Sequence, residues 1–193
     1  KNEKFNWNNN LNYDLLNQFW ILMLPNQIRS SEQKCKDWGD VGFQGDDPST
    51  DFRGMGLLGL HQLTYFATSY PTQAREILNS SNHPRRYYPF AATGINITSF
   101  IFELLNELRL QTKLYEVLEN NRLNYSTTWD DNITNSDTNQ LISLGISVVN
   151  DIYCEIYIEF NRVWVEEDPE DIMQFQKIFN QVKKHYREKY RLF

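Results

Sequence analysis

Residues 141–163 read LISLGISVVNDIYCEIYIEFNRV. Apolar side chains recur in this stretch every three or four residues, which is the spacing of one face of an α-helix. The stripe consists of Leu141, Leu144, Val148, Ile152, Ile156, Phe160 and Val163. Some of its members are β-branched and favour helices only weakly, so we expect packing against other helices to stabilise it. The pattern predicts a long core helix that begins between Asp137 and Gln140.

The same spacing occurs in most of the remaining chain. It predicts helices at Leu11–Leu24, at Met55–Tyr70, at Pro71–Leu78, from near Asn96 or Thr98 through Leu108, and from Ile172 to Tyr186. The last helix has a clear start signal, because Asp168 can cap it and Pro169 suits its first position. The sequence shows no strand-like alternation bounded by turn dipeptides. It therefore predicts an all-α, single-domain helical bundle of roughly seven helices.

The length and composition fit one globular domain. The chain has 193 residues, of which 40% are hydrophobic and 15% aromatic. A chain of this length buries about 70% of the surface that its unfolded form exposes. Residues 1–10 and 124–139 are rich in Asn, Ser, Thr and Asp, which favour turns and loops. We expect a flexible N-terminal tail at residues 1–10 and a folded domain over residues 11–193.

Charge and cysteine content narrow the class of partner. The net charge of −6 disfavours nucleic acid, because a phosphate backbone would be repelled. The longest apolar stretch, Phe19–Pro25, is too short to cross a bilayer, so we expect no transmembrane segment. Cys35 and Cys154 lie far apart and lack CxxC spacing. Free thiols in a reducing, cytoplasmic compartment are the favoured interpretation, and a single bridge is the alternative.

Two other patterns point to chemistry only weakly. Residues 54–59 read GMGLLG, which matches the GxGxxG pattern of dinucleotide sites. The pattern follows a polar turn rather than a buried strand, so close packing between helices is the better interpretation. His61, His83 and His185 are too widely spaced, relative to one another and to the cysteines, for a local metal site. We therefore expect no bound metal.

Two charge clusters flank the predicted last helix. The acidic cluster near its start contains Glu166, Glu167, Asp168, Glu170 and Asp171. The basic cluster near its end contains Lys183, Lys184, Arg187, Lys189 and Arg191. Both placements complement the helix dipole, so capping is the simpler interpretation. A membrane-surface role for the basic cluster is the alternative.

A long loop predicted at residues 25–52 is the most informative part of the chain, since loops of this length in compact domains usually have a function. Residues 38–54 read WGDVGFQGDDPSTDFRG. Three glycines, Gly42, Gly45 and Gly54, surround one arginine without helical periodicity. This density predicts a loop of fixed shape that presents Arg53.

These residues resemble the ELMO domain family, and in particular its ELMOD-type branch, whose motif reads approximately WxxxGFQxxxPxTDxRGxGxxxLxxLxxF. The matching positions are Trp38, Gly42, Phe43, Gln44, Pro48, Thr50, Asp51, Arg53, Gly54, Gly56, Leu60, Leu63 and Phe66. The similarity continues through residues 88–91, 94–98 and 166–175. It covers nearly the whole chain except the first ten residues and the Asn-rich stretch near residue 130.

The resemblance implies a GTPase-activating protein for Arf and Arf-like (Arl) small GTPases, with Arg53 as its catalytic arginine finger. It implies no independent enzymatic activity and no cofactor, because the partner GTPase carries GTP and Mg²⁺. Peripheral membrane association would come through that partner. The scaffold branch of the family works with DOCK exchange factors on Rac and lacks this arginine pattern. A non-catalytic adaptor that binds a small GTPase or its exchange-factor complex is therefore the alternative.

The other motif residues are expected to shape the loop; they are Trp38, Gly42, Phe43, Gln44, Pro48, Thr50, Asp51, Gly54 and Gly56. Asp51 could hold Arg53 in place, while Gln44 and Thr50 could fix the backbone. We expect Trp38 and Phe43 to be core residues beneath the loop, with contacts to the GTPase as the alternative. The competing interpretation of Arg53 is an internal ion pair with Asp47 or Asp51 that braces the turn.

Overall fold

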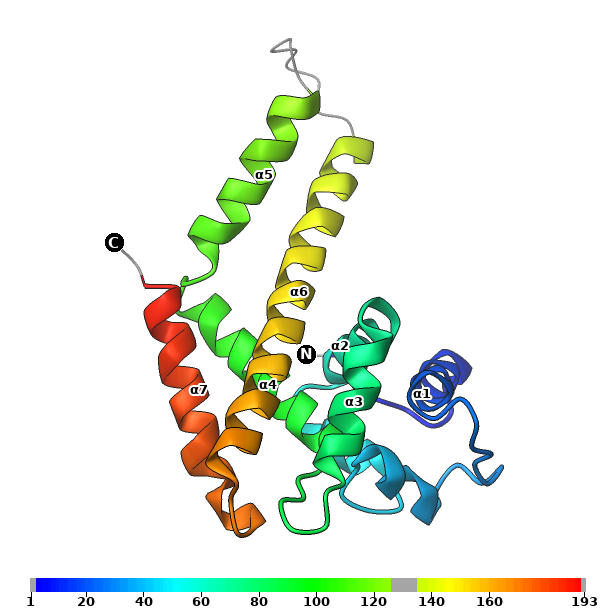
Figure 1. The fold of residues 1–193 in the computed structure, drawn as a ribbon. Helices are drawn as coiled ribbons and strands as arrows, with labels where there is room; N and C mark the ends of the chain where they lie inside the picture. The colour runs from blue at the N-terminus through cyan, green and yellow to red at the C-terminus, as the bar shows by residue number, and fades with distance from the viewer. Residues whose placement is uncertain (1–2, 126–134, 192–193) are drawn as a thin grey trace.

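The structure, a computed structural model, describes residues 3–125 and 135–191, and all regular structure within them is helical (Figure 1). Its α-helices are α1 (Asn10–Met23), α2 (Leu57–Ser69), α3 (Pro71–Ser81), α4 (Phe90–Asn106), α5 (Gln111–Tyr125), α6 (Asn135–Glu167) and α7 (Phe175–Lys189). The same residues contain short 3-10 helices at η1 (Lys36–Val41), η2 (Pro48–Arg53) and η3 (Ile172–Gln174). The predicted all-α bundle of about seven helices is confirmed.

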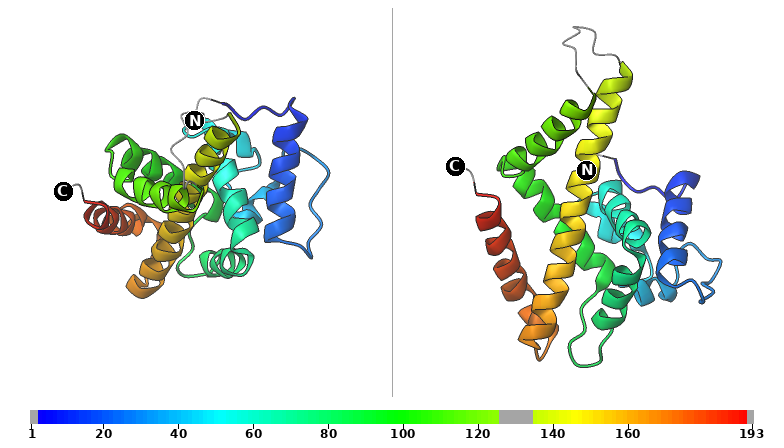
Figure 2. Two further views of the ribbon diagram at one scale, coloured as in Figure 1. Left: turned by 90° about the horizontal axis from the view of Figure 1, so that it is seen from above. Right: turned by 45° about the horizontal axis from the view of Figure 1, so that its top comes forward.

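Helix α6 runs through the middle of the bundle (Figures 1 and 2). It contacts α2, α3, α4, α5 and α7, while α1 packs farther out against α2 and α3. Its buried face includes Val148, Ile152, Ile156, Phe160 and Trp164. This confirms the predicted core helix, although α6 begins at Asn135 and continues past Val163 to Glu167.

Aromatic rings fill the contact between α2, α4 and α6. The ring centroids of Phe90 and Tyr157 are 4.8 Å apart, and those of Phe66 and Tyr157 are 5.3 Å apart. The Tyr157 hydroxyl donates a hydrogen bond to the Phe90 carbonyl oxygen at 2.5 Å, so burial leaves this polar group paired. Burial of each ring contributes about 2 kcal/mol to folding. The cluster therefore fixes the start of α4 against α6.

Helix α4 begins at Phe90, about two turns before the predicted start near Asn96 or Thr98. Pro89 precedes its first turn. The Ala92 N–H in that turn donates a hydrogen bond to the Gly42 carbonyl at 3.1 Å. A segment distant in sequence thus satisfies a donor that the helix itself leaves unpaired. Apolar spacing along α4 could not reveal this contact.

The start of α7 also differs from the prediction. Helix α6 continues to Glu167, and Asp168 adopts a left-handed conformation with φ of 43°. Asp168 therefore does not cap α7, which begins only at Phe175. Pro169 is buried in the turn rather than placed at a helix start.

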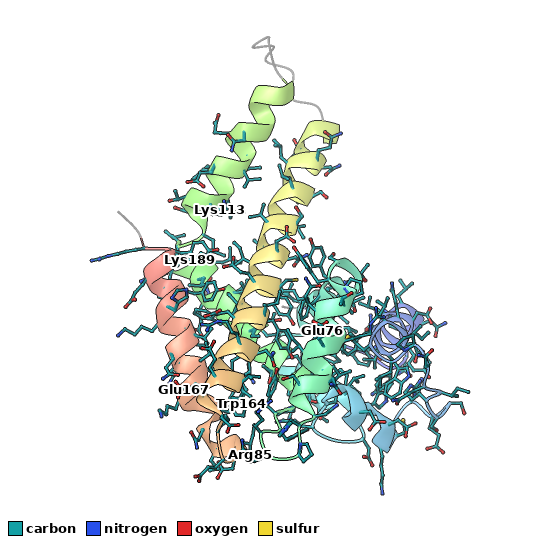
Figure 3. The ribbon with its side chains drawn as sticks, viewed as in Figure 1. Glu76, Arg85, Lys113, Trp164, Glu167 and Lys189 are labelled. Carbon is teal, nitrogen blue, oxygen red and sulfur yellow. The ribbon has the colours of Figure 1, made fainter. Side chains whose placement is uncertain are left out.

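The Asp168 carboxylate forms ion pairs rather than capping α7. This carboxylate pairs with Arg85 and with Arg86, at 3.2 Å in the second case, and Arg85 lies at the lower end of the molecule in Figure 3. Within this acidic cluster, Asp171 is the residue that caps a helix. Its side chain accepts a hydrogen bond from the Met173 N–H at 2.8 Å at the start of η3. The interpretation of the whole acidic cluster as a helix cap is therefore wrong.

Helix α5 has no counterpart among the predicted helices. Leu114, Val117 and Leu118 share its half-buried face, whereas Tyr115 is exposed. Helix α5 and the first half of α6 extend away from the rest of the bundle (Figure 1). Residues 126–134 of the predicted loop at 124–139 lie outside the described residues, and residues 135–139 belong to α6.

By length and composition alone, residues Thr138–Glu167 of α6 could also cross a membrane. Residues 148–164 of this segment supply the buried face described above. The first half exposes Leu141, Ile142 and Ile146. Because the second half packs against several other helices, we assign α6 to the bundle.

Candidate functional site

The candidate site is the segment Cys35–Gly56, which we call the Arg53 loop and which contains η1 and η2. It is drawn light blue at the lower right of Figure 1, and η2 contacts α2 and α4. The Cys35 N–H donates a hydrogen bond to the Asp46 carbonyl at 2.9 Å, which brings the start of the loop beside its middle. The predicted loop at 25–52 is thus partly ordered into short helical turns.

Three aromatic side chains anchor the Arg53 loop on the core. Trp38, Phe43 and Phe52 are at most 3% exposed. The ring centroids of Trp38 and Phe43 are 6.1 Å apart in an edge-to-face contact. The Trp38 indole N–H donates to the Gln33 carbonyl at 2.8 Å, and the Arg29 guanidinium lies 4.2 Å above the Trp38 ring. Trp38 and Phe43 therefore lie beneath the loop, and neither ring faces solvent.

Gly42 joins the Arg53 loop to the start of α4. Its φ is 81°, a conformation that favours glycine. A Cβ atom at this position would lie 2.1 Å from the Phe90 nitrogen. No residue with a side chain fits here unless α4 moves. The loop and α4 are consequently locked together at their backbones.

Asp47 organises the start of η2. Its carboxylate accepts hydrogen bonds from the Ser49 N–H and hydroxyl at 3.0 and 2.6 Å, and from the Trp7 indole at 3.0 Å. The Lys34 ammonium lies 2.7 Å from the other carboxylate oxygen. Burial opposes ionisation, but these partners together hold the pKa of Asp47 below its usual value. Pro48 is buried at the first position of η2.

Asp51 and Thr50 hold the loop backbone. The Asp51 carboxylate accepts a hydrogen bond from the Gln44 N–H at 2.8 Å, and the Thr50 hydroxyl donates to the Asp47 carbonyl at 2.9 Å. Burial raises the pKa of Asp51, although the Gln44 N–H and the charge of Arg53 act in the opposite direction. Asp51 is therefore used to fix the loop and not to bind the guanidinium directly.

Arg53 lies at the end of η2 with its side chain exposed. Its Nε–H donates a hydrogen bond to the Thr50 carbonyl at 2.8 Å. Among the residues that the structure describes, its terminal nitrogens Nη1 and Nη2 have no hydrogen-bond partner and no carboxylate pairs with them. Within the described residues the alternative ion pair with Asp47 or Asp51 is not formed: Asp47 pairs with Lys34, and Asp51 accepts the Gln44 N–H. Nε thus anchors the guanidinium, while Nη1 and Nη2 are free to donate hydrogen bonds to a partner.

The two glycines after Arg53 differ in geometry. Gly56 has φ of 58° and ψ of −147° immediately before α2, a conformation that only glycine adopts readily. Gly56 therefore sets the direction in which α2 leaves the loop. A Cβ atom on Gly54 or on Gly45 would meet no atom within 4 Å. A loop-shaping role for those two glycines stays a prediction.

Residues 3–9 pack against the Arg53 loop, whereas the sequence predicted a flexible tail here. We call this segment the N-terminal strap. The Phe5 ring stacks on the Phe52 ring at 5.3 Å, Trp7 donates the hydrogen bond described above, and the Glu3 carbonyl accepts the first N–H of α2 at 2.9 Å. The high Asn content of the segment is typical of a loop, whereas the contacts of Phe5 and Trp7 place it against the core. Two aromatic residues in so short a stretch were the available sign of burial.

Comparison with known proteins identifies the family. Residues 1–179 match the ELMO/CED-12 family. The chain belongs to this family. It is 36% identical over 180 residues to human ELMO domain-containing protein 2, covering 92% of this chain and 50% of that protein. No solved structure matches the chain.

Two further relatives agree with this assignment. ELMO domain-containing protein B of Dictyostelium discoideum is 37% identical over 183 residues, covering 94% of this chain and 54% of that protein. Human ELMO domain-containing protein 1 is 31% identical over 209 residues, covering 95% of this chain and 56% of that protein. The chain spans about half the length of the curated relatives that it matches.

Other candidate sites in this ELMO-family chain have structural explanations. In the GxGxxG segment, a Cβ atom on Gly59 would lie 3.2 Å from the Ile95 side chain, so this glycine permits close packing of α2 and α4. Cys35 and Cys154 are free and buried, and burial raises the pKa of the Cys154 thiol, which disfavours a reactive thiolate. No group of three His, Cys, Asp or Glu side chains in the described part of the chain could hold a metal. The Arg53 loop is therefore the candidate site.

Proposed function

We propose that this ELMO-family domain is a GTPase-activating protein for Arf or Arf-like small GTPases, and that Arg53 is its arginine finger. The observation that carries the proposal is the exposure and hydrogen bonding of the Arg53 guanidinium. It is exposed, anchored through Nε, and unpaired at its terminal nitrogens among the described residues. Membership of a family associated with small-GTPase signalling supports the class of partner.

The chemistry of GTP hydrolysis requires such a group. Negative charge develops on the oxygens around the γ-phosphorus, and a guanidinium inserted by a partner protein stabilises it. The planar fork of arginine contacts two oxygens at once, which a lysine ammonium cannot do in the same geometry. An arginine finger accelerates hydrolysis by about 10³-fold to 10⁵-fold. The GTPase would bring GTP and Mg²⁺, so the domain would need no cofactor of its own and would act in the cytoplasm.

The Arg53 loop suits this role because its shape does not depend on Arg53. Gly42, Asp47 and Asp51 hold the backbone through bonds in which the guanidinium takes no part. Arg53 can therefore leave the Thr50 carbonyl and enter a partner site while the turn keeps its shape. A loop that is already ordered loses less conformational entropy when it binds.

Single-turnover GTP hydrolysis by a panel of purified Arf and Arf-like GTPases tests the proposal. The wild-type domain should accelerate at least one of them. Arg53→Ala should reduce the acceleration by about 10³-fold or more, and Arg53→Lys should restore little of it. Arg75→Ala is a matched control, since Arg75 is also exposed and its Nη1 donates to a single carbonyl, that of Leu22, among the described residues. The control should retain the wild-type rate.

The same assay separates the activator from an adaptor. Undiminished acceleration by both Arg53 variants would refute the finger role. GTPase binding without any acceleration by the wild-type domain would support the adaptor instead. Pull-downs should agree, because an activator prefers GTPase loaded with a transition-state analogue over GTPase loaded with GDP.

A further inference from the structure

A second surface lies where α4 ends and α5 begins, beside the last turns of α7. It is a depression of about 800 Å³ lined by Arg109, Asn180, Lys183, Lys184, Arg187, Glu188 and Arg191. We call its five cations the basic corner. Lys113 and Lys189, labelled in Figure 3, mark the helices on its two sides. The corner and the Arg53 loop lie on opposite sides of α6 (Figures 1 and 2).

The inner cations of the basic corner are compensated by carboxylates. The Lys183 ammonium lies 2.9 Å from Glu103, and the Arg187 guanidinium lies 2.7 Å from Glu103 and 2.8 Å from Glu107. Arg109 donates from Nη1 to the Arg187 carbonyl at 2.8 Å, which joins the start of α5 to α7. These contacts build the corner and fix its shape.

The outer cations are much less compensated. The Lys184 side chain is 81% exposed, and its ammonium is 4.0 Å from Glu188. Arg191 is exposed and has no ion-pair partner within the described residues. Among the residues that the structure describes, the carboxylates recorded at the five cations are those of Glu103, Glu107 and Glu188. The corner therefore carries a local positive excess on a chain whose net charge is −6.

An exposed leucine in a strained conformation lies at the same corner. Leu108 has φ of 58° and is 51% exposed. Its N–H donates to the Leu105 carbonyl and the Arg109 N–H donates to the Leu104 carbonyl, which is the Schellman pattern that ends a helix. Glycine or asparagine is the usual residue at this position, because the Cβ atom of other residues disfavours the left-handed conformation. Burial in the core does not account for leucine here, since half of its surface is exposed.

We propose that the basic corner docks on a membrane surface that contains anionic phospholipids. The outer cations would contact headgroup phosphates, and Leu108 would enter the interface between headgroups and acyl chains. A soluble phosphate would use the charges but would leave the exposed leucine without a function. The cations call for a partner with negative charge, and Leu108 calls for an apolar layer next to that charge. Docking at this corner would leave the Arg53 loop accessible on the other side of the bundle.

Co-sedimentation with phosphatidylcholine vesicles, prepared with and without phosphatidylserine, tests the proposal. The wild-type chain should bind the phosphatidylserine vesicles more strongly, and added salt should weaken that binding. Each cation near an anionic surface contributes about fivefold to partitioning, so Lys184→Glu with Arg191→Glu should reduce it by at least about 30-fold. The matched control is Lys36→Glu with Lys177→Glu, which changes the net charge equally at two exposed lysines outside the corner.

Leu108→Asn tests the apolar contact without damaging the fold. Asparagine tolerates the left-handed conformation, so the thermal midpoint should equal or exceed that of the wild type. Partitioning should nevertheless fall by about tenfold, because the apolar contact is lost.

Three outcomes would overturn the proposal. They are equal binding to both kinds of vesicle, wild-type binding by either corner variant, and an equal loss in the control pair. GTP hydrolysis does not enter this assay, so its result is independent of the role proposed for Arg53.

Discussion

The Arg53 loop and the basic corner both present arginine side chains, but different interactions hold the two regions. Packed aromatic rings and hydrogen bonds to backbone groups hold the loop, and Arg53 contributes only one contact to a carbonyl. In the corner, Arg187 itself binds the carboxylates of Glu103 and Glu107. An arginine whose ion pairs stabilise the surrounding helices cannot leave them without a cost in stability. An arginine on a loop that other residues hold in place can instead insert its side chain into a partner's site.

The strongest test of this difference is Gly42→Ala. The added Cβ would collide with the start of α4, and the left-handed φ would add strain. We expect the free energy of unfolding to fall by about 3 kcal/mol or more, measured by urea denaturation. Gly45→Ala is the control, because a Cβ atom there meets nothing within 4 Å. It should change stability by less than about 0.5 kcal/mol. Equal effects of the two variants would mean that the junction of Gly42 with α4 does not hold the loop.

A smaller effect is expected from Trp7→Phe, which keeps an aromatic ring but removes the hydrogen bond to Asp47. The free energy of unfolding should fall by about 1 kcal/mol, measured by circular dichroism in urea. A double-mutant cycle with Asp47→Ala isolates this bond from the other contacts of Asp47. A coupling energy of zero would show that the hydrogen bond of the N-terminal strap adds nothing to the Arg53 loop.

The ion pairs of the basic corner predict a pH dependence of stability. Hydrogen bonds from Arg187 and Arg109 lower the pKa of Glu107 from its usual 4.5 to about 2. Since the pKa is lower in the folded state, the stabilisation is present above about pH 4.5 and is lost as the pH falls towards about 2. The side chain is 34% exposed, so solvent screening limits the effect to about 1 kcal/mol or less.

Thermal melting across this pH range checks the prediction for Glu107. Glu107→Gln should show a shallower loss of stability on acidification than the wild type. Glu116→Gln serves as the control, because Glu116 is exposed and its ion pair with Lys113 is 3.8 Å long. If the profiles of Glu107→Gln and the wild type coincide, the ion pairs of Glu107 contribute no net stability.

Helices with one continuous apolar stripe could be predicted from the sequence. Helix α1 was expected at Leu11–Leu24 and lies at Asn10–Met23, and the long stripe of α6 was recognised throughout. Helix α5 was not predicted, although Leu114, Val117 and Leu118 recur at helical spacing on its half-buried face. The starts of α4 and α7 were misplaced because partners distant in sequence determine them. The Gly42 carbonyl supports the first turn of α4, and two arginines draw Asp168 away from a capping role.

The sequence by itself determined the helical class, the long core helix and the arginine within a loop rich in glycine and aromatic residues. These features depend on the spacing and composition of neighbouring residues, which the chain displays directly. Only the tertiary structure decided that Arg53 is exposed and unpaired, that Asp51 binds the loop backbone, and that the N-terminal strap packs beneath η2. Those outcomes depend on which distant groups compete for each carboxylate and each buried surface, and that competition is settled only when the helices pack together.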